Sequence, residues 1–330
     1  MMYNKTWQEQ ALEYFKQGLS SRKICKKLGW ETTKKSTINT FLKPYREALV
    51  LASLGALTNE VVNNVKEKRE LQVLYFDIEN SPEEGYFWNR WKTNIAECQV
   101  KRYSHILTVA WAFNDGEVQT TKLSVDDVAN EDDLTAVVDL AQAINKADII
   151  VGFNSKKFDI KVLKTRMIKH GLPPLKPVKH IDIYQTAKSQ MRFPSNSMDN
   201  IAKYLGYSEL KIKTNFDLWK RCLDTDNFQV SNNALEEMRV YNKHDIVITR
   251  NLYKKFQGWA TGVNVGTIVN QIEPKNHTLR CSKCGSDDIH AMEDFTYTQT
   301  SGFSLYRCGN EECRGVSRIT SNGKNLVGVV

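Results

Sequence analysis

Carboxylates in three short segments of the sequence could together hold divalent metal ions. The segments are Tyr75-Phe-Asp-Ile-Glu79, Asn154-Ser-Lys-Lys-Phe-Asp159 and Tyr241-Asn-Lys-His-Asp245. Hydrolysis of a phosphodiester needs an activated water and relief of the negative charge that builds on the phosphate, and two divalent cations supply both. Such cations prefer oxygen ligands. Because clustered carboxylates repel one another and raise each other's pKa when no cation is present, the pattern indicates a site for metal-dependent phosphodiester hydrolysis.

Two apolar runs are expected to present the first three acids. Residues 71–78 are rich in types that suit a largely buried strand, and Asp77 and Glu79, two positions apart, would face the same side of it. Residues 147–152 form a second short apolar run. It would deliver Asn154 and Asp159 at a strand-to-helix turn.

The last acid is expected on a helix. Residues 235–256 carry apolar side chains at spacings of three and four, which predicts a helix. Tyr241 and Asp245 are four apart and would be neighbours on one helical face. That pairing would place a phenol beside a metal-binding carboxylate, where it could orient an attacking water.

In this order the three motifs resemble those of the DEDD superfamily of 3′–5′ exonucleases, which have a ribonuclease H-like fold. The third motif reads Tyr-x-x-x-Asp, and the histidine of the other branch is replaced by Val240, so the tyrosine branch (DEDDy) is the better match. The motifs are similar to those of the proofreading exonuclease of family B DNA polymerases. Over roughly residues 70–320 the layout also resembles stand-alone phage-type ribonuclease H-like proteins with a C-terminal zinc ribbon, including the stretches at 192–196 and 216–219.

The resemblance implies a role for each motif residue. Two Mg²⁺ or Mn²⁺ ions would be held by Asp77, Glu79, Asp159 and Asp245. Tyr241 would position the nucleophile. Asn154 would contact substrate or brace the site, and Phe158 would contact substrate. Taken singly, Asp159 could merely cap a helix and Tyr241 could be a core aromatic, but the joint pattern favours the catalytic interpretation.

The remaining patterns predict an α/β fold, with a ribonuclease H-like mixed five-stranded sheet flanked by helices. Further strands are expected at 106–113, 118–123 and 178–183, and a helix at 134–147. The expected parts of the chain are a helix-turn-helix-like basic module at 1–46, a helical linker at 47–70, the exonuclease domain at 71–260 and a zinc ribbon at 275–322.

Four of the seven cysteines lie in two close pairs, Cys281 with Cys284 and Cys308 with Cys313. Four thiolates in two pairs suit one tetrahedral Zn²⁺, and residues 295–300 and 303–307 between them predict a hairpin. Redox-active dithiols are the competing interpretation. A structural ribbon is as plausible as one that grips nucleic acid, for which the candidate contacts are Lys283, Arg307, Arg314 and Arg318.

Basic residues are concentrated at the N-terminus of a chain with a net charge of +8, the sign expected of a nucleic-acid binder. Residues 7–16 are amphipathic, and Ser21 and Gly29 could bound a second, short helix. The segment resembles a helix-turn-helix of the resolvase or transposase type, which would bring Lys34, Lys35 and Asn39 near duplex DNA. The alternative is a plain helical bundle used for packing or protein contacts.

The segment Tyr86-Phe-Trp-Asn-Arg-Trp-Lys92 combines aromatic and basic residues. Its rings could stack on the bases of a single strand, as in sequence-tolerant binding. Equally, they could fill the space beneath a loop.

Together these features predict a metal-dependent 3′–5′ exonuclease that acts on single-stranded 3′ ends, of DNA rather than RNA. The alternatives are a structure-selective endonuclease of the same fold and a DNA-binding or replication-accessory protein with weak or no catalysis. Replication or recombination proteins are possible partners. The sequence has neither a membrane-spanning apolar run nor a secretory signal, so we expect no membrane association and a cytoplasmic setting, that of the host if a phage encodes the protein.

Overall fold

The computed structural model describes residues 6–17, 19, 21–43, 69–89, 91, 93–273, 278–321 and 323–329. The chain divides into two units, Met1–Asn63 and Asn64–Val330, and each is described by itself. Of the predicted linker at 47–70, all but the last two residues lie outside the described part of the chain.

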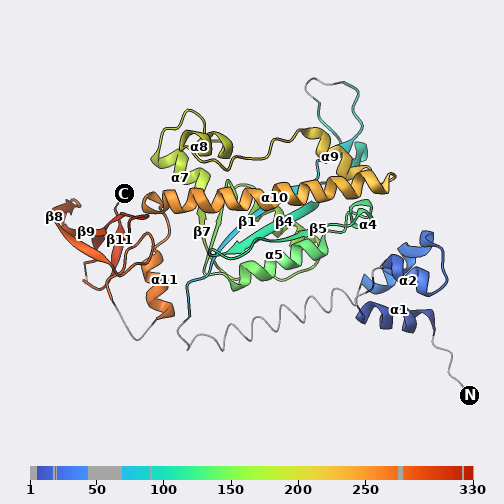
Figure 1. Ribbon diagram of the computed structural model, residues 1–330, viewed down its shortest axis with the longest axis horizontal. Helices are drawn as coiled ribbons and strands as arrows, with labels where there is room; N and C mark the ends of the chain where they lie inside the picture. The colour runs from blue at the N-terminus through green and yellow to red at the C-terminus, as the bar shows by residue number, and fades with distance from the viewer. Residues whose placement is uncertain are drawn as a thin grey trace, which may run out of the picture. The chain divides into compact units, whose positions relative to one another are not determined.

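A five-stranded mixed sheet forms the centre of the larger unit (Figure 1). In sheet order the strands are β5 (Gln119–Lys122), β4 (Ile106–Phe113), β1 (Val73–Asn80), β6 (Ile149–Gly152) and β7 (Lys179–Asp182). β1 pairs antiparallel with β4 and parallel with β6, so an antiparallel meander and two parallel strands meet at β1. The predicted fold class is confirmed, and each predicted strand of the sheet lies within about two residues of its expected position.

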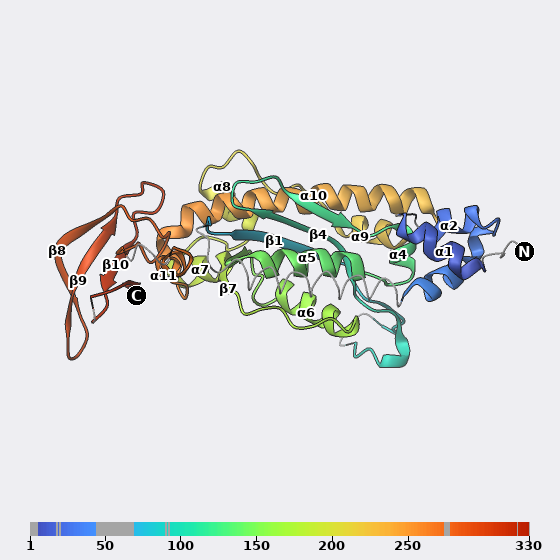
Figure 2. The same cartoon turned by 90° about the horizontal axis from the view of Figure 1, so that it is seen from below.

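Helices cover both faces of this sheet, as Figure 2 shows. α10 (Phe228–Phe256) runs along one face, together with α7 (Ile183–Gln190) and α8 (Met198–Tyr204). α5 (Leu134–Lys146) packs on β4 and β5 from the other face, with α6 (Asp159–Lys169) beside it. Further helical elements of this part are α4 (Val125–Ala129), α9 (Phe216–Leu223), η3 (Glu97–Gln99) and η4 (Gln257–Trp259).

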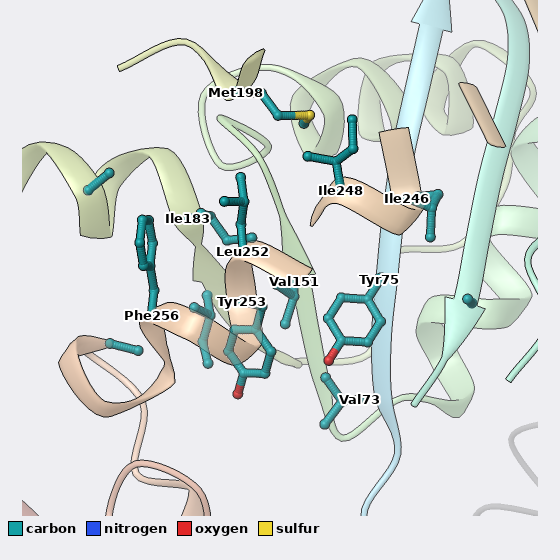
Figure 3. Close-up of a cluster of buried hydrophobic side chains, with 14 of the residues drawn as sticks. Val73, Tyr75, Val151, Ile183, Met198, Ile246, Ile248, Leu252, Tyr253 and Phe256 are labelled. Carbon is teal, nitrogen blue, oxygen red and sulfur yellow. The ribbon is translucent and has the colours of Figure 1, made fainter. Parts of the chain in front are cut away.

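The central strand β1 is buried on both faces, which explains its nearly continuous apolar sequence. Val73 and Tyr75 pack under α10 in the cluster of Figure 3, and Leu74 and Phe76 are fully buried on the opposite face. Because side chains alternate along a strand, Asp77 and Glu79 continue the face that α10 covers. The register of one buried strand therefore directs both acids toward the helix that carries the third motif.

α10 is longer than the sequence predicts, because it begins at Phe228 rather than near residue 235. The side chain of Asn227 caps it by accepting a hydrogen bond from the Val230 amide. The added turns pack on α9, where the Ser231 hydroxyl donates to the Cys222 carbonyl at 2.7 Å. Among the described residues, no helix has the length and apolar character needed to cross a lipid bilayer.

A second, four-stranded antiparallel sheet follows α11 (Val265–Ile272) near the C-terminus. Its order is β11 (Leu326–Gly328), β10 (Val316–Ile319), β9 (Gly302–Cys308) and β8 (Ile289–Tyr297). The predicted hairpin between the cysteine pairs is β8–β9, whose register runs from Ile289 opposite Cys308 to Tyr297 opposite Gly302.

The N-terminal unit contains short helices around a small core: α1 (Trp7–Lys16), α2 (Ser21–Lys27), η1 (Thr32–Lys34) and a helix whose described part is 35–43. Gly29, with φ +69°, follows α2, and the Trp30 amide donates back to the Cys25 carbonyl, as expected of a helix end. Ser21 does not precede α2 as a cap but is its first residue.

Two of the predicted DNA contacts have partners within this unit. The Lys34 ammonium lies over the Trp30 ring, 5.6 Å from its centroid. Asn39 accepts a hydrogen bond from the Ser21 hydroxyl. Asn39 therefore helps to join two helices, and DNA contacts by Lys34, Lys35 and Asn39 stay a prediction.

Candidate active site

Three carboxylates from two elements converge at the carboxyl end of β1. Asp77 and Glu79 come from the strand and Asp245 from α10, and one ligand oxygen of each lies within 4.8 Å of the others. The residues are far apart in sequence, and the packing of α10 on β1 brings them together. This arrangement is what a hard divalent cation requires of its ligands.

Asn242, which the sequence analysis missed, fixes the orientation of Asp77. Its amide nitrogen donates to Asp77 Oδ2 at 2.7 Å, and its amide oxygen accepts from the Thr108 hydroxyl at 2.8 Å. Asn242 is fully buried. Its position three residues before Asp245 places it on the same helical face, which is the signal that could have identified it.

The second motif forms the turn between β6 and α6, as predicted. Asp159 is the first residue of α6, and its Oδ1 accepts a hydrogen bond from the Ile78 amide at 3.0 Å. It therefore does not act as the helix cap of the alternative interpretation. Asp159 is not one of the three carboxylates within 4.8 Å, yet its charge contributes to the raised pKa of Asp77.

A second missed residue, Asp182 at the end of β7, holds this turn. Its two carboxylate oxygens accept from the amides of Asn154 and Lys156, at 3.0 and 2.9 Å. Asn154 has φ +61°, a left-handed conformation that asparagine tolerates better than most residues. The Ser155 side chain packs directly against the backbone of Gly152. A Cβ on residue 152 would lie only 2.4 Å from the Ser155 hydroxyl, so this contact requires glycine. Phe158 is about half exposed at the start of α6.

A third missed residue, Lys211, supplies a cation to the site. Its Nζ lies 2.7 Å from Asp245 Oδ2 and 4.9 Å from the centroid of the Tyr241 ring. Tyr241 is buried and packs edge-on against Trp219, with ring centroids 6.3 Å apart. Lys211 lies in an irregular segment between α8 and α9, so neither periodicity nor motif spacing marks it.

The electrostatics of the site are unfavourable to four ionised acids. Burial, with the charges of Asp159, Glu79 and Asp245 adding to it, raises the pKa of Asp77 well above its usual range. Burial also raises the pKa of Glu79 to about 8 and that of Asp159 to about 7. The pKa of Asp245 is raised by burial although Lys211 opposes the shift.

A divalent cation fits this donor set. Lys211 is the one cation in contact with Asp245 among the described residues, and one positive charge does not balance four carboxylates. In the described structure, the buried oxygen Oδ1 of Asp245 has no hydrogen-bond partner. Buried polar atoms are rarely left unpaired, and a cation would be its partner. The site is therefore a candidate metal centre.

The four paired cysteines form a second candidate metal site. Their sulfur atoms lie within 4.8 Å of one another, with Cys281 3.8 Å from Cys313 and Cys284 3.5 Å from Cys308. The predicted grouping of the two pairs is thus present. The Cys313 carbonyl also lies against Gly258 in η4. A Cβ on residue 258 would be only 2.1 Å from that oxygen, so this contact requires glycine.

The prediction that Lys283 contacts nucleic acid is wrong. Lys283 is buried, and its Nζ donates to the Ala260 carbonyl at 2.7 Å. It therefore joins the cysteine-containing sheet to the segment after α10. A lysine between two cysteines looks exposed from sequence because it has no apolar pattern, and only the packing of two parts of the chain buries it.

A known protein family matches the middle part of this chain. Residues 97–257, which include Asp159, Tyr241 and Asp245, match the RNase_H_2 family of the RNase H superfamily. Among solved structures, the chain is similar to the family B DNA polymerase of the hyperthermophilic archaeon Pyrobaculum calidifontis, with a TM-score of 0.42 and 18% identity. That match covers 72% of this chain and 33% of the polymerase, so the chain spans about a third of the polymerase's length. No curated protein sequence gives a significant match.

The order of the strands, the helices on both faces of the sheet and the matched segment all fit one fold. The larger unit of this protein contains a domain of the ribonuclease H-like fold.

Proposed function

We propose that this protein is a metal-dependent 3′–5′ exonuclease of the tyrosine DEDD branch that acts on single-stranded 3′ ends, of DNA rather than RNA. The convergence of Asp77, Glu79 and Asp245 within 4.8 Å, in a ribonuclease H-like domain, carries this proposal. The nearby Asp159 and Tyr241 complete the set of side chains that such chemistry requires. The preference for DNA is supported by the basic N-terminal unit.

The resemblance to the DEDD exonucleases implies which residues would hold the metal ions, and the grouping of Asp77, Glu79 and Asp245 supports it. Asp77, Glu79 and Asp245 would bind one Mg²⁺ or Mn²⁺, and Asp77 and Asp159 would bind a second. Bound there, the cations would supply an activated water and offset the charge that develops on the phosphate.

Tyr241 is suited to orienting the water rather than deprotonating it. Burial and the charges of Asp245 and Glu79 raise its pKa. The phenol therefore stays protonated at neutral pH and remains a hydrogen-bond donor and acceptor. Lys211 contacts both Tyr241 and Asp245, so it fixes the position of the phenol relative to the carboxylate.

An end-labelled strand tests the reaction and its direction. With Mg²⁺ or Mn²⁺, a 5′-labelled single strand should be shortened stepwise, a 3′-labelled strand should release its label in the first step, and a circular single strand should survive. Parallel assays on DNA and RNA of the same sequence show which of the two is the substrate. Nicking of the circle would replace the proposal with an endonuclease, and binding without metal-dependent hydrolysis would replace it with an accessory protein.

Lys211→Met is expected to lower kcat about 10- to 100-fold, the range typical for residues that position metal ligands. The substitution removes the charge but keeps the length of the side chain, and Lys211→Arg should restore part of the activity. Lys203→Met is the matched control, because Lys203 pairs with Asp199 on an exposed face. Steady-state kinetics of all three variants provide the measurement. A folded Lys211→Met variant with normal kcat would show that Lys211 has no positioning role.

We also propose that the four cysteines bind one Zn²⁺. Cys284→Ser should reduce bound zinc from about one per chain and destabilise the β8–β11 sheet, since structural zinc contributes roughly 10–16 kcal/mol in small domains. Cys98→Ser is the control, because Cys98 is exposed and outside the cluster. Elemental analysis combined with thermal unfolding gives the measurement. A fully folded wild-type C-terminal sheet without bound metal would contradict the assignment.

A further inference from the structure

An exposed aromatic hairpin follows the first catalytic motif directly. β2 (Glu84–Gly85) and β3 (Val100–Arg102) form its antiparallel stem, in the teal loop beside α9 in Figure 1. Four rings near its tip are exposed to solvent: Tyr86 (69%), Phe87 (55%), Trp88 (96%) and Trp91 (86%). The interpretation in which these rings fill the space beneath a loop is therefore wrong.

The hairpin is held together by its own polar groups rather than by the aromatic rings. The Tyr86 amide donates to the Gln99 carbonyl at 2.8 Å, and the Gln99 side chain bonds the Tyr86 carbonyl and the Ala96 amide, each at 2.9 Å. Near the tip, the Asn89 side chain accepts from the Trp91 amide at 3.1 Å. These hydrogen bonds do not involve the exposed rings, so the rings are available to contact another molecule.

The stem is anchored next to the candidate active site. The Trp219 indole donates to the carbonyl of Asn80, the residue after Glu79, at 3.0 Å, and the same indole packs on Tyr241. Arg102 of β3 donates to the Leu223 carbonyl at the end of α9, at 3.3 Å. α9 therefore contacts both the hairpin stem, through Arg102, and the site, through Trp219.

The chemistry of the tip favours nucleic acid over a protein or lipid surface. Exposed rings of this size are uncommon on a soluble domain unless they bind something. Residues 86–96 contain Arg90 and Lys92 and no acidic residue, in a chain of net charge +8. Aromatic rings interleaved with cations suit a strand whose bases are unpaired and whose phosphates are accessible.

We propose that this hairpin binds unpaired bases of the substrate strand, which stack on Trp88 and Trp91 before the strand reaches the carboxylates. The proposal rests on the proposed exonuclease function for the identity of the strand. In a duplex the faces of the bases are already stacked on one another, so the hairpin selects single strands.

Binding to the full-length protein tests this proposal. Hydrolysis is prevented by Asp77→Asn in all samples, and the probes are fluorescent dT and rU oligonucleotides and a duplex of the same length. Trp88→Ala/Trp91→Ala should weaken binding of one or both single strands roughly tenfold or more, because each stacked base contributes substantially. Duplex binding should change little. Trp259→Ala and Tyr297→Ala, which remove exposed rings elsewhere, are the matched controls.

A second measurement uses a substrate too short to reach the hairpin. With Asp77 intact, the kcat for the p-nitrophenyl ester of thymidine 5′-monophosphate should be unchanged in the double tryptophan variant, whereas KM for a long strand should rise. An equal loss of activity on both substrates would show a general disturbance of the site and overturn the proposal.

The outcomes separate this proposal from the proposed function. Tryptophan-dependent binding in a protein that shows no hydrolysis would support the hairpin and reject the exonuclease. Unchanged affinity for dT and rU in the double variant would overturn the hairpin proposal even with full exonuclease activity, and the rings would then contact another protein. An equal loss for duplex and single strand would also overturn it. Loss confined to dT or to rU supports the proposal and identifies the strand as DNA or RNA.

Discussion

Asp77→Asn or Asp245→Asn is expected to lower metal-dependent hydrolysis by ~1,000-fold or more, because the loss of a metal ligand removes several kcal/mol of transition-state stabilisation. Asp77→Asn should also raise the thermal stability of the metal-free protein at pH 8. It replaces a group whose pKa is raised in the folded state, and which therefore lowers stability at this pH, with a neutral amide. Nuclease assays and thermal unfolding in buffer stripped of divalent cations measure both effects.

Asp133 provides a contrasting control for Asp77, because it is fully buried but has cationic partners. Its carboxylate lies 2.6 Å from both Arg166 Nε and His170 Nε2 and accepts from the Ile106 amide at 2.9 Å. Burial opposes ionisation, yet His170 and Arg166 hold its pKa below the usual value. Asp133→Asn should therefore destabilise the protein, by about 3–5 kcal/mol if the pair behaves as buried ion pairs usually do.

The two kinds of carboxylate thus give opposite results if the assignment is correct. Asp77→Asn should yield a stable and inactive protein, and Asp133→Asn a less stable protein whose folded fraction remains active. Undiminished hydrolysis in both Asp77→Asn and Asp245→Asn would reject the catalytic assignment. Destabilisation of Asp77→Asn comparable to that of Asp133→Asn would make Asp77 a structural residue.

The metal-free protein is expected to lose stability as the pH rises from about 6.5 to about 8. In this range the folded state still holds protons on Asp77 and Glu79, whose pKa values are raised, whereas the unfolded chain has already released them. The folded state therefore binds more protons, and the free energy of unfolding falls with pH by about 1.4 kcal/mol per unit for each proton. At lower pH, His180, whose burial lowers its pKa to about 3, contributes in the opposite direction, so the upper range isolates the carboxylates.

Mg²⁺ or Mn²⁺ should reverse this loss, because a bound cation favours the ionised carboxylates. Thermal unfolding between pH 6.5 and 8, with and without added Mg²⁺, measures the effect. Ion-exchange resin is preferable to a strong chelator for removing divalent cations, since a chelator would also compete for metal at the cysteines. The decrease of stability with pH should be smaller in Asp77→Asn. An unfolding midpoint that rises with pH in the metal-free wild type, or that does not change when Mg²⁺ is added, would contradict the metal-site assignment.

Local patterns identified most of the elements that carry the site. The apolar runs at 106–113 and 147–152 become β4 and β6, because buried strands in a sheet covered on both faces need apolar residues throughout. The start of α10 was missed because residues 228–234 are mostly polar. Their helical structure depends on the Asn227 cap and on packing against α9.

The sequence by itself determined the motif acids, the two cysteine pairs and the fold class, since each depends on residue type and on spacing within one element. Only the tertiary structure decided that Asn242, Asp182 and Lys211 support the acids, because these contacts join residues far apart in the chain. It also decided that Lys283 is buried and that the rings of the hairpin are exposed. Burial depends on what packs against a segment, and no short stretch of sequence contains that information.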